Sequence, residues 1–493
     1  MLSCFCLCYK IPGMSFTSFN FLIFFPSVIV IYYLLPVRFR WVFLLLASYY
    51  FYINIEPIYA LLLLGITVTT YFFALLIAQS KSSKRKKLLL IISIVISLCP
   101  LFFFKYFNFV NNGIFHLLSY TGIKWSLPHI SLLLPIGISY YTLTALGYII
   151  DVYNKEIEAR KNFGTVALFL AFFPLVLSGP IERATNLFHQ FEGKLLFNYG
   201  KIVKGLQFML WGYFMKLVVA DRIAIYESAI FNNIERHTGH SVFLAVLLYP
   251  IQVYADLGGY SLIAIGTAKA LGIDVMQNFN RPFFATSMSE FWRRWHISLI
   301  SWLTDYIYTP LAFSLRKYKI KGIVIAIMIT FIISGLWHAA SLSFLIWGLL
   351  QGTFLSIEAI INKRRAFFVK KYNLNTKGAY IFICSVFTYL LFAFSEIFGG
   401  AVDSVTSALA VIKKIFTNFS GPFYYETPSM IIFLSIGIFL LFFAEWITEY
   451  YKGVFSFFNN RSWVIRAVSY AFLIIIILLI GVFDGGQFIY FKF

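Results

Sequence analysis

Charged side chains are scarce in this 493-residue chain, because Asp, Glu, Lys and Arg together make up only 12% of it. A soluble domain carries about 25% charged residues. The chain also holds 58 Phe, 32 Tyr and 10 Trp, more aromatic surface than a water-soluble globule of this size could bury. These features exclude a soluble enzyme, a fibrous protein and a disordered chain. The sequence predicts an all-α, polytopic integral membrane protein.

Cysteine is also rare, with five residues in the whole chain. Three of them crowd the first ten positions, and Cys99 and Cys384 stand in apolar stretches. Neither a pairing pattern nor a ligand spacing emerges, so we expect no disulfide framework and no metal. The sequence equally lacks a phosphate-binding loop, a dinucleotide glycine fingerprint and a Gly-x-Ser-x-Gly nucleophile motif. We therefore expect no bound cofactor and no covalent serine mechanism.

Acidic residues are half as frequent as basic ones, 20 against 40, which gives a formal net charge of +20. Basic clusters lie between apolar runs, near residues 81–87, 316–321 and 363–371. This is the pattern of cytoplasmic loops in membrane proteins and not of a nucleic-acid-binding surface, so no nucleic acid partner is expected. The clusters predict a multi-pass protein of the cell (inner, cytoplasmic) membrane, embedded in the lipid bilayer with an extracytoplasmic N-terminus.

Apolar runs of the length that spans a membrane recur along the whole chain and predict roughly 11–14 membrane segments. The candidates lie near 18–35, 41–55, 58–79, 88–104, 130–150, 164–180, 202–220, 241–256, 257–272, 322–337, 341–360, 379–397, 429–446 and 464–484. Breaks at 135–137 and 178–180 indicate short or re-entrant segments around a central cavity, because irregular backbone at membrane depth needs protein or water to satisfy it. We expect one membrane-embedded domain over 14–493 and interpret residues 1–13 as an extension from an upstream start site.

The least membrane-like stretch, residues 278–310, is predicted to contain an amphipathic helix. At about 100° per residue, its tryptophans fall on one side, and Arg293 and Arg294 lie near His296. One interpretation is an interfacial anchor helix. The other is a site in which paired guanidinium groups and aromatic rings grip the phosphates of a ligand beside a titratable imidazole. Both remain open on these residues alone.

A second histidine, His338, follows the apolar run 322–333. Ionisable side chains within a membrane segment are costly and usually face a bundle interior or a wet cavity, although a structural histidine bonded to a backbone carbonyl is the alternative. Two such imidazoles suit general-base work on a hydroxyl that attacks an acyl thioester. The apolar runs contain few carboxylates, which favours a transferase over an ion-coupled transporter. Asp256 and Asp305 are the carboxylates expected near a site.

Two segments, 291–306 and 335–338, resemble the membrane-bound O-acyltransferase family, and within it the branch of bacterial alginate O-acetyltransferases. The first reads Phe-Trp-Arg-Arg-Trp-His-Ile-Ser-Leu, with Trp-Leu and Asp-Tyr after it, and the second reads Gly-Leu-Trp-His. Supporting motifs lie at 135–139, 148–153, 178–181, 220–222, 259–261 and 278–282, so the resemblance extends in order over about residues 14–360.

The resemblance implies that His338 is the catalytic histidine and that His296 assists it or shapes the site. It implies an acyl thioester donor in the cytoplasm, with acetyl-CoA expected, and a polysaccharide acceptor outside. The acyl group would pass directly or through a periplasmic or extracellular acyltransferase partner. The further candidates for substrate or donor binding are Arg293, Arg294, Trp295, Asp305, Trp337 and Tyr260.

Three other functions remain open at this point. One is D-alanyl transfer to teichoic acid, and another is O-acetylation of peptidoglycan. A third, from a different class, is transport of a lipid or glycan. Transport would depend on an ion gradient without consuming a thioester, whereas transfer would release the free thiol of the donor.

Overall fold

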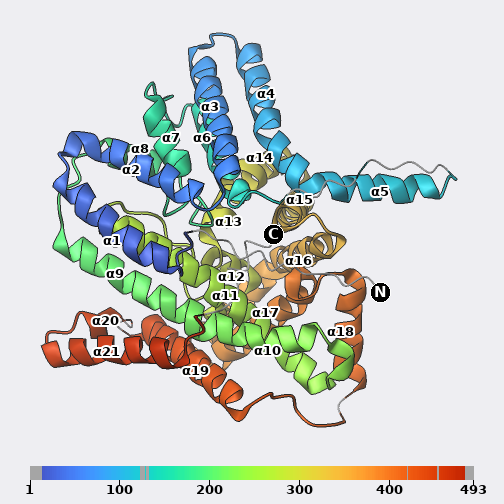
Figure 1. Ribbon diagram of the computed structural model, residues 1–493. Helices are drawn as coiled ribbons and strands as arrows, with labels where there is room; N and C mark the ends of the chain where they lie inside the picture. Colours follow the sequence, from blue (N-terminus) through green and yellow to red (C-terminus); the bar gives the residue numbers. More distant parts are fainter. Residues whose placement is uncertain are drawn as a thin grey trace. The chain divides into compact units, whose positions relative to one another are not determined.

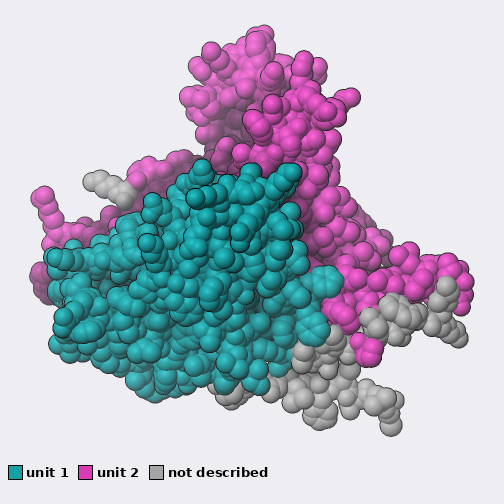
Figure 2. All heavy atoms as spheres, turned by 90° about the horizontal axis from the view of Figure 1, so that it is seen from above, with its two compact units in different colours: residues 1–104, 133–203, 267–275 teal, residues 105–132, 204–266, 276–493 magenta. Residues whose placement is uncertain are grey.

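The computed structural model describes residues 14–122, 128, 133–418, 420–451, 453 and 455–483. In these ranges every regular element is helical. Two compact units can be distinguished, each built from separate stretches of the chain, and Figure 2 colours them teal and magenta. Unit 1 comprises residues 1–104, 133–203 and 267–275, and unit 2 comprises residues 105–132, 204–266 and 276–493. The single domain over 14–493 stays a prediction, and the proposed extension 1–13 lies outside the described residues.

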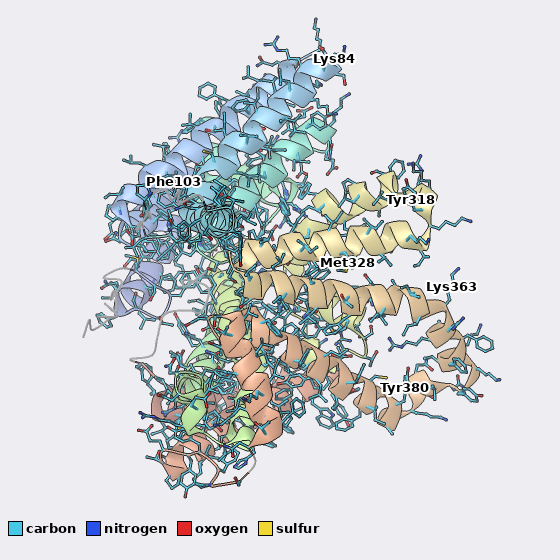
Figure 3. The ribbon with its side chains drawn as sticks, turned by 90° about the vertical axis from the view of Figure 1, so that its right-hand side faces the viewer. Lys84, Phe103, Tyr318, Met328, Lys363 and Tyr380 are labelled. Carbon is cyan, nitrogen blue, oxygen red and sulfur yellow. The ribbon has the colours of Figure 1, made fainter. Side chains whose placement is uncertain are left out.

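Unit 1 is a set of helices from the first part of the chain. They are α1 (Phe19–Leu34), α2 (Val37–Ile53), α3 (Pro57–Gln79), α4 (Ser83–Leu101), α6 (Ile138–Asn154), α7 (Phe163–Ala171) and α8 (Ala184–Glu192). α3 and α4 pack side by side as a long hairpin, with Lys84 near its tip (Figures 1 and 3). The predicted breaks both interrupt helical structure: Gly137 has φ +82°, and a Cβ there would lie 2.3 Å from the carbonyl oxygen of Val176. The two interrupted segments therefore touch each other.

Unit 2 holds most of the remaining helices. They are α5 (Phe107–Ser119), α9 (Tyr199–Tyr213), α10 (Asp221–Phe231), α11 (Gly239–Ala270), α12 (Met288–Arg294), α13 (Ile297–Leu303), α14 (Thr309–Ser314), α15 (Ile320–His338), α16 (Leu342–Lys371), α17 (Gly378–Glu396), α18 (Val405–Thr417), α19 (Pro428–Tyr450), α20 (Phe455–Phe458) and α21 (Trp463–Ile480). Four π-helical stretches interrupt or extend them: η1 (Phe102–Tyr106), η2 (Phe214–Ala220), η5 (Thr304–Tyr308) and η8 (Ile397–Ala401). Such stretches are rare and frequently mark functional sites.

Nine helical segments in the described part of the chain are long and apolar enough to cross a membrane. They are Pro57–Gln79, Ser83–Ser119, Tyr199–Phe231, Gly239–Ala270, Ile320–His338, Leu342–Lys371, Gly378–Ala401, Pro428–Tyr450 and Trp463–Ile480. Helix α1 is apolar but shorter. The predicted class, an all-α polytopic membrane protein, is confirmed.

One predicted boundary is wrong: segments 241–256 and 257–272 form the single 32-residue helix α11. In the structure, Gly259 allows close packing along this helix, since a Cβ on it would lie 2.8 Å from the carbonyl oxygen of Gly212. Small residues of this kind let membrane helices approach without interrupting them.

Helices α15 and α16 form the tightest helical pair of unit 2 and carry His338 at their turn. Tyr318 and Lys363 lie at one end of this pair, with Met328 part-way along it (Figure 3). His338 and Ser341 lie at the opposite end, because α15 runs from Ile320 to His338 and α16 runs back from Leu342. The end with Tyr318 and Lys363 carries the basic clusters 316–321 and 363–371, so we predict that this end is cytoplasmic.

Candidate active site

The backbone changes direction at His296, so the amphipathic helix predicted through this segment is not continuous. α12 ends at Arg294, Trp295 is extended, and His296 has φ +45° and ψ +49°, in the left-handed region. α13 begins one residue later, at Ile297. The prediction that the tryptophans lie along one side of a single helix is therefore wrong, because they are divided between two helices and the break between them.

Asn278, outside both helices, holds this break in place. Its side-chain Oδ1 accepts hydrogen bonds from the backbone N–H of Ser298 at 3.2 Å and from its hydroxyl at 2.8 Å. Its Nδ2 donates to the hydroxyl of Ser261 at 3.0 Å, and its backbone carbonyl accepts from the N–H of Ile297 at 2.8 Å. Asn278 is fully buried. A buried amide with all these partners fixes the left-handed conformation of His296, which a β-carbon disfavours.

His338 is the last residue of α15, as its position after the apolar run predicted. The chain turns through three residues, and Ser341 caps α16 by accepting a hydrogen bond from the N–H of Phe344 at 3.2 Å. Close contact between the two helices requires glycine: a Cβ on Gly335 would lie 2.3 Å from the carbonyl oxygen of Phe344. The tip of the hairpin thereby presents His338 in a fixed position.

The structure brings the two predicted histidines together. The ring centroids of His296 and His338 are 6.5 Å apart at an angle of 67°. Aromatic rings wall the pair: Trp337 lies 6.2 Å from His296 and 4.9 Å from His338, and Trp347 lies 5.2 Å from His338. Phe344 stacks on His338 at 6.0 Å. The two imidazoles thus share one enclosure, although 42 positions separate them in the sequence.

Both histidines are buried, with 1% of His296 and 8% of His338 exposed. Burial lowers the pKa of His296 to about 3, because the charged imidazolium loses its hydration. His296 is therefore neutral throughout the physiological range. A neutral imidazole keeps one ring nitrogen as an acceptor, so it can shape a hydrogen-bonded site without adding charge.

Several polar side chains that sequence reasoning missed fix the aromatic walls of this enclosure. The indole N–H of Trp347 donates to Glu396 Oε1 at 2.8 Å. The indole N–H of Trp292 donates to Gln351 Oε1 at 3.2 Å, and Gln351 Nε2 donates to the hydroxyl of Ser395 at 2.6 Å. The paired residues are 44 to 59 positions apart in the chain, so no local signal in the sequence identifies the pairs.

Lys105 and Tyr106 hold the carboxyl end of α15 and were also missed. Lys105 Nζ donates to the backbone carbonyl of Trp337 at 2.6 Å and lies 5.8 Å over the Trp337 ring. The Tyr106 hydroxyl donates to the carbonyl of Leu336 at 2.9 Å. The last carbonyls of a helix lack intrahelical partners, and a cation there is favourable. These contacts fix the turn that carries His338.

The two arginines predicted to bind the donor differ in their surroundings. Arg294 forms ion pairs with Glu290 at 2.7 Å and with Glu449 at 2.9 Å. Arg281 also pairs with Glu449, at 2.5 Å. Arg293 is exposed. Arg294 therefore ties α12 to α19, and Arg293 is the better placed of the two to meet a phosphate from solvent. Their roles in donor binding stay predictions.

The remaining predicted site residues lie in three different settings. Trp295 is buried among aromatic rings, stacked on Phe291 at 5.3 Å and 4.9 Å from Phe392. Tyr260 is buried on α11, and Asp305 is exposed on η5. The structure thus joins Trp337 to the histidine pair, whereas Trp295 packs in the core and Asp305 lies at the surface.

The apolar spans are not as poor in carboxylates as we predicted. Asp221, Glu227, Asp256, Glu396 and Glu445 are all buried, and each belongs to a segment able to span a membrane. The scarcity of intramembrane carboxylates therefore does not distinguish a transferase from a transporter. That distinction depends on the histidine pair and on similarity to known proteins.

The model of the membrane-bound O-acyltransferase family matches residues 154–398, which include both histidines. The chain is 36% identical to the probable alginate O-acetylase AlgI of Pseudomonas aeruginosa over 360 residues, covering 72% of this chain and 67% of that protein. It is 36% identical to the probable alginate O-acetylase AlgI of Azotobacter vinelandii over 352 residues, covering 70% and 68%.

A third relative is the peptidoglycan O-acetyltransferase of Helicobacter pylori, which is 31% identical over 345 residues, covering 64% of this chain and 63% of that protein. The two relatives from Pseudomonas and Azotobacter each align over about two thirds of their length. The region matched by the family model, residues 154–398, contains both histidines and the aromatic rings around them. The chain therefore belongs to the membrane-bound O-acyltransferase family and is a multi-pass membrane O-acyltransferase.

Proposed function

We propose that this protein moves an acetyl group from a cytoplasmic thioester, acetyl-CoA, to a hydroxyl of an extracytoplasmic polysaccharide. The transfer occurs directly or through a periplasmic or extracellular acyltransferase partner, and the protein resides in the cytoplasmic membrane. The observation that carries the proposal is the buried pair of His296, at the break between α12 and α13, and His338, at the tip of the α15–α16 hairpin, whose ring centroids are 6.5 Å apart.

His338 acts as the general base in this proposal. It removes the proton from the attacking hydroxyl while the hydroxyl oxygen forms its bond to the thioester carbonyl carbon. The carbon–sulfur bond then breaks, and the imidazolium returns the proton to the departing sulfur, which leaves as a free thiol. His296, held by Asn278, orients the reacting groups in the shared enclosure.

The names of the three relatives described above support acetyl as the transferred group, since all three are named for O-acetylation. They name two different acceptors, alginate and peptidoglycan, and both are polysaccharides. Teichoic acid D-alanyltransferases also match the chain, at the lower identities of 27% and 26%. The alternatives are D-alanyl transfer to teichoic acid and, in a different class, transport of a lipid or glycan. Neither has a specific feature of the described residues in its favour.

The experiment compares His338→Ala with His189→Ala in full-length protein reconstituted into lipid vesicles. His189 is an exposed histidine on α8. Among the described residues, its ring nitrogen Nδ1 forms a hydrogen bond with the carbonyl of Thr185, in the same helix. Labelled acetyl-CoA is supplied on one side and polysaccharide on the other, and both free thiol and labelled glycan are measured.

We expect His338→Ala to lose transfer by at least ~100-fold, because a positioned base contributes about 10²–10⁴-fold. His296→Ala should be less severe, and His189→Ala should behave like the wild type. Transfer at a wild-type rate by His338→Ala would refute the mechanism. Glycan movement that needs an ion gradient and releases no thiol would favour the transporter.

A further inference from the structure

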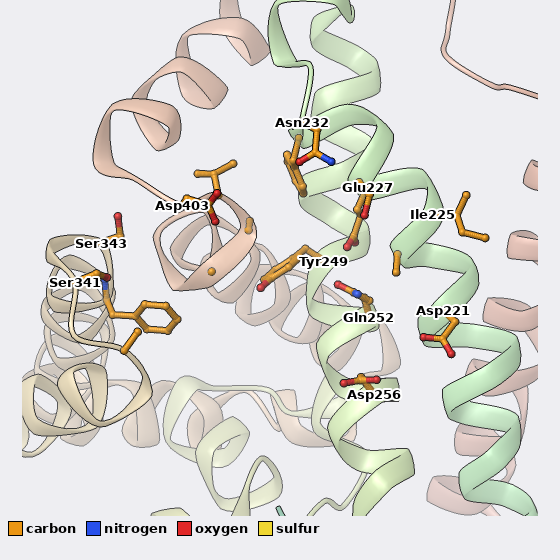
Figure 4. Close-up of a pocket in the computed structure, with 18 of the residues that line it drawn as sticks. Asp221, Ile225, Glu227, Asn232, Tyr249, Gln252, Asp256, Ser341, Ser343 and Asp403 are labelled. Atoms are coloured by element: carbon orange, nitrogen blue, oxygen red, sulfur yellow. The ribbon is translucent and has the colours of Figure 1, made fainter. Parts of the chain in front are cut away.

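A cavity of about 690 Å³ opens beside the histidine enclosure, in unit 2. Its wall includes Ala339, Ser341, Ser343 and Phe344, which directly follow His338 in the chain. Phe344 also stacks on the His338 ring at 6.0 Å, so one side chain separates the cavity from the imidazole. Figure 4 shows Ser341 and Ser343 on one side of this space and side chains of α10 and α11 on the other.

The cavity lies at the end of the α15–α16 hairpin that is opposite to the basic residues. Tyr318 and Lys363 mark the predicted cytoplasmic end (Figure 3), whereas Ser341 lies at the turn. A compound that enters the cavity therefore approaches His338 from the extracytoplasmic side. That is the side from which the proposed function needs an acceptor to arrive.

Acidic side chains outnumber basic ones on the cavity wall. Its ionisable acidic and basic lining side chains are Lys216, Asp221, Glu227, Asp256 and Asp403 (Figure 4 labels the four acids). The one cation among these described lining residues is already paired, because Lys216 Nζ lies 2.8 Å from Asp221 and 2.5 Å from Asp256. An anionic compound would therefore meet carboxylates without a cation to receive it.

Glu227 shows that the wall is built for a hydrogen-bonding ligand. Its side chain is 3% exposed and points into the cavity (Figure 4). Its Oε1 has no hydrogen-bond partner among the described residues. A buried acceptor without a partner is costly, and a hydroxyl of a ligand would satisfy it. Gln252 and Asn232 add amide groups nearby, and Tyr249 adds an aromatic ring.

We propose that this cavity is the acceptor site and that it selects an uncharged, hydroxyl-rich sugar segment over a polyanionic chain. The inference rests on the proposed function and narrows its acceptor class. Carboxylates accept hydrogen bonds from sugar hydroxyls, amides both accept and donate them, and an aromatic side chain covers the apolar face of a sugar ring. Polyanions are instead recognised by Arg and Lys, which are not available in this wall.

The first experiment uses full-length protein in lipid nanodiscs with labelled acetyl-CoA. An oligomannuronate and the same oligomer after carboxyl reduction serve as matched acceptors that differ in charge alone. We expect kcat/KM for the reduced, neutral oligomer to be at least ~10-fold higher, because juxtaposed like charges oppose binding. Equal acceptance of both oligomers overturns the inference while the proposed function stands.

Two other outcomes of this experiment separate a failure of the proposed function from a failure of the acceptor site. Acetylation of neither oligomer, with no other acceptor labelled, contradicts the proposed function and the inference with it. Labelling of a protein hydroxyl in place of any sugar leaves acyl transfer intact but overturns the sugar site. The two proposals therefore fail in different ways.

The second experiment changes the charge of the wall. Asp403→Lys, at an exposed lining position, should reduce the preference for the neutral oligomer several-fold, because it supplies a cation. Glu227→Leu, which removes the buried acceptor, should raise the KM for the neutral oligomer and leave the KM for the donor unchanged. Glu426→Lys and Glu426→Leu are the matched controls, since Glu426 is exposed and outside the cavity wall. If substitution of Glu426 changes the preference for the neutral oligomer as strongly as substitution of Asp403 does, the effect does not come from the cavity and the inference is refuted.

Discussion

The close contact at Gly335 yields a sharp prediction about catalysis. A Cβ at this position would lie 2.3 Å from the carbonyl oxygen of Phe344 and 3.3 Å from the Cα of Gly348, where ordinary contact begins at 3.4 Å. In Gly335→Ala, helix α16 must therefore move by about 1 Å relative to α15. Overpacking of this size costs about 1–3 kcal/mol of stability. Because His338 is one turn further along α15, a shift of about 1 Å should lower the rate of acyl transfer about 100-fold.

The assay measures the initial rate of acyl transfer together with the melting temperature of the purified protein. Gly65→Ala is the matched control, because Gly65 is also within a membrane helix, α3, and a Cβ there meets no atom within 4 Å. We expect the control to keep its rate and its melting temperature. Gly335→Ala with the turnover of the wild type, or with a loss no greater than that of Gly65→Ala, would refute the claim that this contact positions His338.

Three further predictions concern the same site. Asn278→Ala removes the acceptor for two buried donors of Ser298, so it should lower kcat at least ~10-fold without changing the donor KM; an unchanged kcat contradicts the positioning role. The neutral state of buried His296 predicts that stability falls as pH falls from about 6.5 toward 3, by up to ~1.4 kcal/mol per pH unit, because only the unfolded chain takes up the proton. His296→Gln should flatten that slope in melting temperatures measured against pH, and an unaltered slope would show that other groups cause it. Arg293→Ala should raise the donor KM, whereas Arg294→Ala should lower the amount of folded protein, since it breaks two ion pairs; the reverse pattern would exchange their roles.

The features that sequence reasoning predicted are those encoded over short stretches. An apolar run of sufficient length predicts a membrane helix wherever it stands, so the fold class followed from composition and length. His338 was placed correctly at a helix end because the apolar run stops there. The cap that Ser341 provides for the next helix is a second local signal, which the prediction did not use. Both signals lie within a few residues of each other.

The break at His296 could not be predicted in this way. Its local sequence has helical periodicity, and the left-handed turn depends on hydrogen bonds to Asn278, which is 20 residues from Ser298. Lys105 lies further still, 232 residues from the carbonyl of Trp337 that it caps. Pairing across such distances has no periodic signature in one sequence.

Asp256 was expected near a site, but the buried ion pair that holds it was not predicted. Asp221 and Asp256 look like polar interruptions of apolar runs until Lys216 is placed between them. A buried charge is tolerable when a partner compensates it. Lys216 is on a different helix from Asp256, 40 residues away, although it is only five residues from Asp221.

Phe344 links the chemistry of His338 to the choice of acceptor. Its ring stacks on the imidazole and also forms part of the cavity wall, and its backbone carbonyl is the atom that Gly335 accommodates. A shift of α16 should therefore disturb the base and the acceptor site together, so Gly335→Ala should change both kcat and the acceptor KM. Glu227, in contrast, lines the cavity and is not part of the α15–α16 hairpin. Its substitution should alter the acceptor KM alone, and that separation is what distinguishes a selective acceptor site from a general weakening of the hairpin.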